Sequence, residues 1–162
     1  MIPNPPLGMV HDDPLGRVIV HSERVVEMST MLDHVSVGVS DLEGSRRFYD
    51  AILKPLGLVR TLDFDGGSDW GAAVGQTGVE FTITLETGAG PTRGMHLCFR
   101  AASRELVRAF HRAALESGGS DDGPPGLRPL YHPDYFAAFV IDADGHRIEA
   151  VCHVPITPAR LA

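Results

Sequence analysis

The segment LDHVSVGVSDLEGSRRFYDAIL, residues 32–53, contains a strand pattern that runs directly into a helix pattern. Its first part alternates valines with polar or small residues, which is the period of a half-buried strand. Ser40 with Glu43 three positions later is typical of a capping box, and apolar residues follow at helical spacing until Pro55. The segment therefore predicts a strand followed at once by a helix, with His34 at the beginning of the strand.

The same order of patterns recurs 62 residues later, where His96 takes the place of His34. Between positions 34 and 57, seven of 24 residues equal the residue 62 positions later, against about 6% expected from average composition. The pairs are His34/His96, Glu43/Glu105, Arg46/Arg108, Phe48/Phe110, Ala51/Ala113, Leu53/Leu115 and Gly57/Gly119. The chain is thus predicted to contain two copies of one βαβββ unit.

Short strand candidates follow each predicted helix. In the first copy they are LVRTLDF, WGAAVG and VEFTITLE, and in the second they are LYH, YFAAFVI and HRIEAVCH. The stretch DDGPPGLRP is rich in Gly and Pro and is expected to form turns. These patterns predict an α+β fold with modules at about residues 32–86 and 94–153.

Composition and charge narrow the possible classes of protein. The 162 residues carry a net charge of −7 with no cluster of Lys and Arg, so nucleic acid is not an expected partner. The sequence has neither a secretory signal pattern nor an apolar run long enough for a membrane span, so we expect no membrane partner and a cytoplasmic location. Residues 1–30 are interpreted as an N-terminal extension and 156–162 as a C-terminal tail.

The repeat gives the two histidines a possible common purpose. Imidazoles at equivalent points of duplicated strands can converge on one metal ion, and a carboxylate would complete the set. Glu149 in HRIEAVCH is the best candidate, because an unpaired carboxylate in a central strand would cost several kcal/mol, about the size seen for buried ions after relaxation. A buried salt bridge to Arg100 or Arg147 is the alternative explanation.

The two-module layout and the segments LDHVSVGVSDLEGSRRFYDAIL, GMHLCF and YFAAFVIDADGHRIEAVCH resemble the vicinal oxygen chelate superfamily over about residues 31–155. That group includes glyoxalase I, extradiol dioxygenases, fosfomycin-modifying enzymes and bleomycin-binding resistance proteins. The resemblance implies paired βαβββ modules that form an open, cup-shaped mixed sheet. It also implies a divalent metal ion (Zn, Ni, Mn or Fe(II)) held by His34, His96 and Glu149.

The resemblance leaves three functions open. Glyoxalase-like lyase or isomerase chemistry is favoured, with Glu80 as the closest match to a fourth ligand that moves a proton and Tyr135 as a second candidate for that role; Glu80 could also be a solvated residue at the start of a strand. An iron(II) dioxygenase of the extradiol type is an alternative, although Phe139 stands where those enzymes typically carry tyrosine. The third function is metal-free binding of a small molecule, as in antibiotic resistance proteins.

Candidate substrate contacts lie mainly in RPLYHPDYF, which offers Arg128, Tyr131 and His132 beside Tyr135. Trp70, the only tryptophan, could form part of a pocket wall, with core packing as the alternative. The expected partners are a small-molecule substrate and a second copy of the chain. The sequence leaves open whether the cup closes within one chain or across a homodimer.

Overall fold

The computed structural model describes residues 11–12, 18–19, 32–72 and 81–155. The chain divides into two compact units, Met1–Met31 and Leu32–Ala162. In the first unit, the two-residue strands β1 (His11–Asp12) and β2 (Val18–Ile19) pair antiparallel. All features discussed below belong to the second unit.

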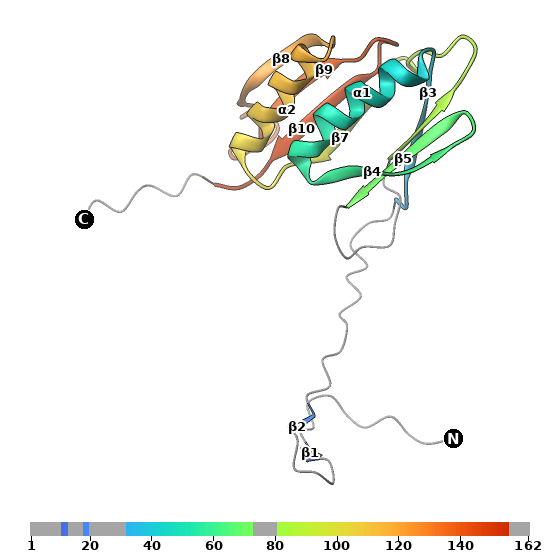
Figure 1. The fold of residues 1–162 in the computed structure, drawn as a ribbon. Coiled ribbons are helices and arrows are strands. Elements are labelled where there is room, and N and C mark those ends of the chain that lie inside the picture. Colours follow the sequence, from blue (N-terminus) through green and yellow to red (C-terminus); the bar gives the residue numbers. More distant parts are fainter. Residues whose placement is uncertain (1–10, 13–17, 20–31, 73–80, 156–162) are drawn as a thin grey trace. The chain divides into compact units, whose positions relative to one another are not determined.

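The second unit contains two modules with the same order of elements (Figure 1). The first module comprises β3 (Val35–Val39), α1 (Leu42–Leu53), the short 3-10 helix η1 (Lys54–Leu56), β4 (Leu58–Phe64), β5 (Gly67–Ala72) and β6 (Phe81–Leu85). The second comprises β7 (His96–Arg100), α2 (Arg104–Glu116), β8 (Ser120–Leu127), β9 (Phe136–Ile141) and β10 (Arg147–Cys152). The predicted α+β class with two similar modules is confirmed.

Each module forms one open, mixed sheet of four strands. The strand orders are β3-β6-β5-β4 and β7-β10-β9-β8, so the first strand of a module pairs with its last strand. That pairing is parallel in both sheets, and the remaining pairs are antiparallel. Identical topology in the two halves agrees with the sequence repeat. It leaves β3 and β7, the strands that follow or contain the two histidines, at the edges of their sheets.

The helix starts differ in one detail from the sequence prediction. Asp41, not Ser40, caps α1, because its carboxylate accepts a hydrogen bond from the Gly44 amide at 3.0 Å. The amide and hydroxyl of Ser40 instead donate to Asp144 in the second module. In α2 the cap is Ser103, 62 residues after Asp41.

The stretch expected to form turns is a strand. Residues 120–127 form β8, which pairs with β9. The pairing is interrupted twice, between Asp121 and Gly123 and between Gly123 and Gly126. Both prolines fall within the second interruption, and β8 is the outer strand of its sheet. Proline is tolerated at edges and bulges because no ladder hydrogen bond is lost there. The predicted strand LYH is a turn.

Both helices pack on one face of the sheets and contact each other (Figure 1). One continuous core includes residues from both modules, among them Tyr49, Trp70, Phe81, Phe110 and Ile148. The rings of Phe81 and Phe99 meet edge-on across the boundary between modules, with centroids 5.6 Å apart. Burial of this shared core holds the two modules together.

A turn of the second module also bonds to the first. The β9–β10 turn contains the buried Asp142, which accepts a hydrogen bond from the Tyr49 hydroxyl at 2.6 Å. A second Asp142 oxygen accepts from the amides of Asp144 and His146, and the ring of His146 bonds the Gly38 carbonyl at 2.8 Å. These contacts fasten the start of β10 to the first module.

Replacing Tyr49 with phenylalanine should cost roughly 1–3 kcal/mol of unfolding free energy at neutral pH, because a buried carboxylate loses a donor. Burial, followed by the charge of Asp142, raises the pKa of Tyr49 well above its usual 10.0. The folded state therefore binds the Tyr49 proton more tightly than the unfolded chain does. The stabilisation that the protonated hydroxyl provides is complete below pH 10.0 and is lost as the pH rises further. Urea unfolding at several pH values should show the wild-type advantage shrinking above pH 10.0. The exposed Tyr131→Phe serves as control.

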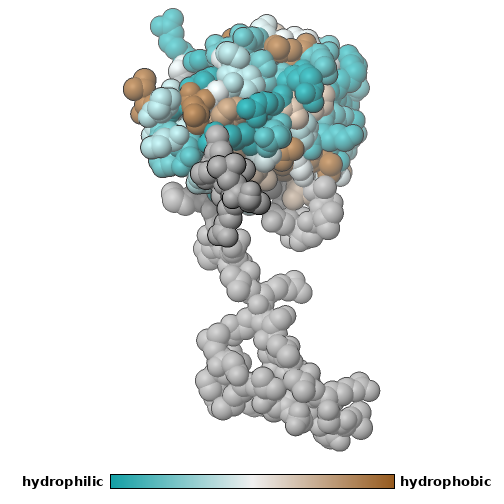
Figure 2. Space-filling view, turned by 90° about the vertical axis from the view of Figure 1, so that its left-hand side faces the viewer, coloured by the Kyte–Doolittle hydropathy of each residue, from teal (hydrophilic) through white to brown (hydrophobic). Residues whose placement is uncertain are grey.

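The visible face of the domain in Figure 2 is mainly hydrophilic, with apolar residues scattered over it. Several large apolar side chains are exposed, and Leu130 is the most exposed of them. None of the described helices is both long and apolar enough to cross a membrane.

Candidate metal site

The candidate site lies on the face of the second sheet that is turned away from the helices. Along β10, Ile148 and Ala150 enter the core, so Glu149 between them points to the opposite face. Its neighbours in the sheet are Cys98 on β7 and Phe139 on β9. β7 is the edge strand of this sheet, yet the Glu149 side chain on the neighbouring strand is only 1% exposed.

Two side chains contact the Glu149 carboxylate. The Tyr135 hydroxyl donates to one oxygen at 2.7 Å, and His96 Nε2 lies 3.1 Å from the other. Within the described residues, neither Arg nor Lys forms an ion pair with Glu149, and Arg147 pairs with Asp122 instead. The salt bridge to Arg100 or Arg147 that the sequence allowed is therefore not formed. A buried carboxylate with a histidine nitrogen beside it and no permanent cation fits a bound metal ion.

Cys98 and Tyr135, which lie beside Glu149, keep their protons at neutral pH. Desolvation, followed by the charge of Glu149, raises the pKa of Cys98 to about 12. Desolvation and the hydrogen bond to Glu149 also raise the pKa of Tyr135 above its ordinary value. Both side chains are therefore neutral and add no further negative charge beside the carboxylate.

His34 is not gathered into this site. Its ring nitrogen Nδ1 lies 2.7 Å from the carboxylate of Asp33, and about half of its side chain is exposed. In the part of the chain that the structure describes, no three or more His, Cys, Asp or Glu side chains are placed to hold a metal ion. The structure thus brings together two of the three predicted ligands.

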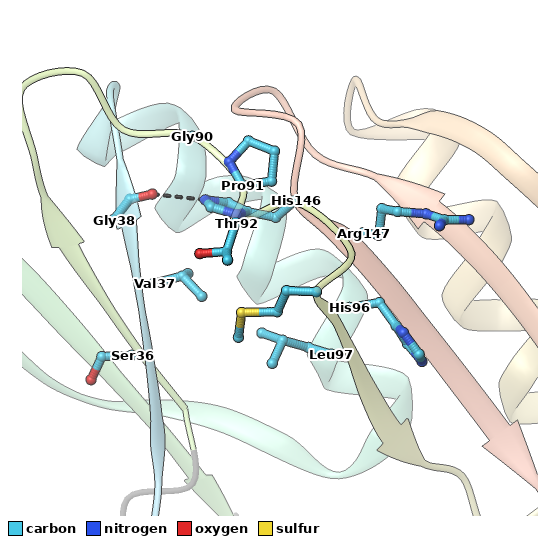
Figure 3. Close-up of a pocket in the computed structure, with 11 residues that line it drawn as sticks. Ser36, Val37, Gly38, Gly90, Pro91, Thr92, His96, Leu97, His146 and Arg147 are labelled. Carbon is cyan, nitrogen blue, oxygen red and sulfur yellow. Dashed lines mark hydrogen bonds between the residues drawn. The ribbon is translucent and has the colours of Figure 1, made fainter.

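A cavity of about 130 Å³ lies between β3 and β7 (Figure 3). Val37 and Leu97 contribute apolar surface, and His96 and Arg147 also line it. His146, bonded to the Gly38 carbonyl, closes one end. The bond between His146 and the first module depends on tertiary packing, so the sequence alone did not single this residue out.

Two aromatic rings lie close to that of Tyr135. The ring of Tyr131 lies 5.2 Å from that of Tyr135, and the ring of His153 lies 5.0 Å from it. His132 is 6.2 Å from His153. The structure therefore places Tyr131 and the exposed His153 beside Tyr135, and His132 beside His153.

Of the other predicted site residues, one lies over a sheet neighbour of Glu149 and one lies in the core. Arg128 packs over the Phe139 ring at 5.5 Å and donates to backbone carbonyls of β8. Trp70 is fully buried in the core of the first module, so core packing describes its environment and a pocket wall does not. Glu80 lies outside the described residues.

Comparison with known proteins identifies the class. The model of the Glyoxalase/Bleomycin resistance protein/Dioxygenase superfamily matches residues 31–150, and this chain belongs to that superfamily. The comparison with curated proteins gave no match.

Solved structures give the same class. A glyoxalase/bleomycin resistance protein from Albidiferax ferrireducens T118 is 35% identical, with a TM-score of 0.67 over 78% of this chain and 100% of that one. A glyoxalase I mutant from Zea mays is 25% identical, with a TM-score of 0.56 over 74% of this chain and 45% of that one. The fosfomycin resistance protein FosX from Listeria monocytogenes is 19% identical, with a TM-score of 0.56 over 77% and 94%, and supports the fold alone.

Proposed function

We propose that this protein is a metal-dependent enzyme that acts on a small oxygen-bearing substrate by glyoxalase-like lyase or isomerase chemistry. The observation that carries the proposal is Glu149, a carboxylate buried to 1% exposure beside His96 with no cationic partner among the described residues. Several superfamily members use divalent metals, and this pair supplies the anionic and imidazole ligands that such an ion prefers. We propose the cytoplasm as the site of action, as the sequence predicts.

His34, His96 and Glu149 would hold the ion, which when bound acts as a Lewis acid toward a substrate oxygen. Tyr135 fixes one Glu149 oxygen by its hydrogen bond and leaves the other toward His96. Such an orienting bond keeps a ligand in its binding geometry. Tyr131 and His132 are proposed to contact the substrate at the edge of the site, and Glu80 remains the sequence-based candidate for moving a proton.

A homodimer would complete this ligand set. His96 begins β7 and His34 directly precedes β3, the edge strands of different sheets, and His34 does not join His96 and Glu149 within the described residues of one chain. We propose that the first module of one copy faces the second module of another, so that His34 of one chain completes the pair in its partner. In a two-fold symmetric dimer this arrangement produces two identical sites.

Metal analysis of protein purified without chelators tests the function. Wild-type protein should contain about one metal ion per chain, and His96→Ala should lose it, because two of the three ligands cannot hold the ion as tightly. His132→Ala is the matched control and should keep its metal. Absence of metal in wild-type protein after loading with each of Zn, Ni, Mn and Fe(II) would contradict the proposal and favour a metal-free binding protein.

Mixing two inactive variants tests the site's location. His34→Ala and His96→Ala, unfolded together and refolded, would form mixed dimers in which one of the two sites has all three ligands. If sites form across the dimer, about one quarter of all sites should regain metal, as random pairing requires. If each site forms within one chain, no site in the mixture is complete and no metal returns.

A further inference from the structure

In the second sheet, Glu149 has a defined place within a row of three residues on the open face. It pairs with Cys98 on one side and with Phe139 on the other. The row therefore reads Cys98, Glu149, Phe139 across three neighbouring strands. This register makes it possible to find the residue that occupies the matching place in the first sheet.

The first sheet contains the same row with different residues. Ser36 is the repeat counterpart of Cys98, since each lies two positions after its module's histidine. It pairs with Thr82 on β6, which in turn pairs with Asp69 on β5. Thr82 is therefore the counterpart of Glu149.

The buried face of the two sheets gives the same correspondence. Phe81, the residue before Thr82, pairs with Trp70, and both are fully buried. Ile148, the residue before Glu149, pairs with Val140, and both are fully buried as well. Because the equivalence holds on both faces of the sheet, it does not depend on the open-face residues alone.

Thr82 and Asp69 form a hydrogen-bonded pair. The Thr82 hydroxyl donates to Asp69 Oδ1 at 2.7 Å, and the threonine is mostly buried. The second carboxylate oxygen of Asp69 has no hydrogen-bond partner among the described residues, and the residue is partly exposed. The pair thus presents a fixed hydrogen-bond acceptor on the open face, where the second module presents the phenyl ring of Phe139.

We propose that Thr82 occupies the place that mirrors Glu149 in the completed cup, so that the first module supplies one metal ligand, His34, and Glu80 is not a fourth. Asp69, held by Thr82, then accepts a hydrogen bond from the substrate and selects molecules whose oxygen carries a proton, such as hydroxyketones, over their ethers. This inference rests on the proposed metal site, because it describes the opposite wall of that site.

Metal affinity tests the ligand part. Thr82→Glu places a carboxylate at the mirrored position and should tighten cobalt(II) binding at least about tenfold in competition with a chelator, with a changed visible spectrum. Thr82→Gln introduces a side chain of the same size as glutamate but without the charge, and it should not tighten cobalt binding. Glu80→Gln should leave affinity and spectrum unchanged. A loss of affinity or a changed cobalt spectrum in Glu80→Gln would overturn this part.

Ligand selectivity tests the role of Asp69. The probes are hydroxyacetone and methoxyacetone, which differ in whether the second oxygen can donate, titrated into cobalt-loaded protein. Wild-type protein should prefer hydroxyacetone, and Asp69→Asn should reduce the ratio of affinities about tenfold while metal content stays unchanged, as expected for a lost bond to a charged group. Asp65→Asn, in the β4–β5 turn, is the control.

The outcomes separate this inference from the proposed function. If wild-type protein binds cobalt but does not discriminate between the two ketones, or if Asp69→Asn keeps the wild-type ratio, the role of Asp69 is refuted while the metal site stands. If wild-type protein binds no cobalt, both proposals fall.

Discussion

Replacing Glu149 with glutamine should change protein stability in opposite directions without and with metal. In the presence of a chelator the variant should be more stable by roughly 1–2 kcal/mol, because a neutral amide replaces a buried carboxylate that has no cationic partner. With metal at 100 to 1,000 times the dissociation constant, wild-type protein should gain about 3–4 kcal/mol and the variant almost nothing. Urea unfolding in both conditions measures the two differences.

The exposed Glu116→Gln, at the end of α2, is the control for Glu149→Gln and should change stability by less than about 0.5 kcal/mol in either condition. A Glu149→Gln variant that keeps the full metal-dependent gain would show that the ion binds elsewhere. A variant destabilised in chelator would mean that the charge of Glu149 already stabilises the protein without metal.

Replacing Trp70 with alanine should lower the free energy of unfolding by about 3–5 kcal/mol, the usual cost of removing a buried tryptophan. The side chain is fully buried, its ring packs 6.0 Å from Tyr49 and 5.9 Å from Phe81, and its indole N–H donates to Asp50 at 3.0 Å. Chemical denaturation monitored by far-UV circular dichroism is the suitable measurement, because the variant has no tryptophan fluorescence.

Trp70→Phe should cost less, roughly 1–2 kcal/mol, because most of the packing stays and the indole hydrogen bond is lost. If Trp70 lined a ligand pocket, as the sequence allowed, Trp70→Ala would lower the free energy of unfolding by less than about 1 kcal/mol and would alter ligand binding instead.

The repeat made most of the fold predictable from sequence. Matching residues 62 positions apart gave the two modules and the placement of His34 and His96, and strand periodicity gave most of the elements. β8 was missed because Gly and Pro signal turns, whereas an outer strand accommodates them at irregularities. Local pattern could not reveal that difference, since it depends on where the strand lies in the sheet.

The site was predictable only in part. Glu149 was found because a carboxylate among apolar residues is costly, but its bond to Tyr135 depends on the path of the turn between β8 and β9. Asp69 carried no signal at all. Its importance follows from the pairing register, and the 62-residue spacing that holds for the first strand and helix does not hold for the last strand, where Thr82 matches Glu149.

The hydrogen bonds of the β9–β10 turn have a consequence for assembly. Asp142 and His146 attach the residues just before β10 to the first module, so Glu149 has a fixed position relative to the opposite half of its own chain. In the proposed homodimer, two such chains would meet as rigid bodies, with the residues that each contributes to a site already in their final orientation. Little conformational entropy would then be lost on association, and the affinity between copies could be high even with a small contact area.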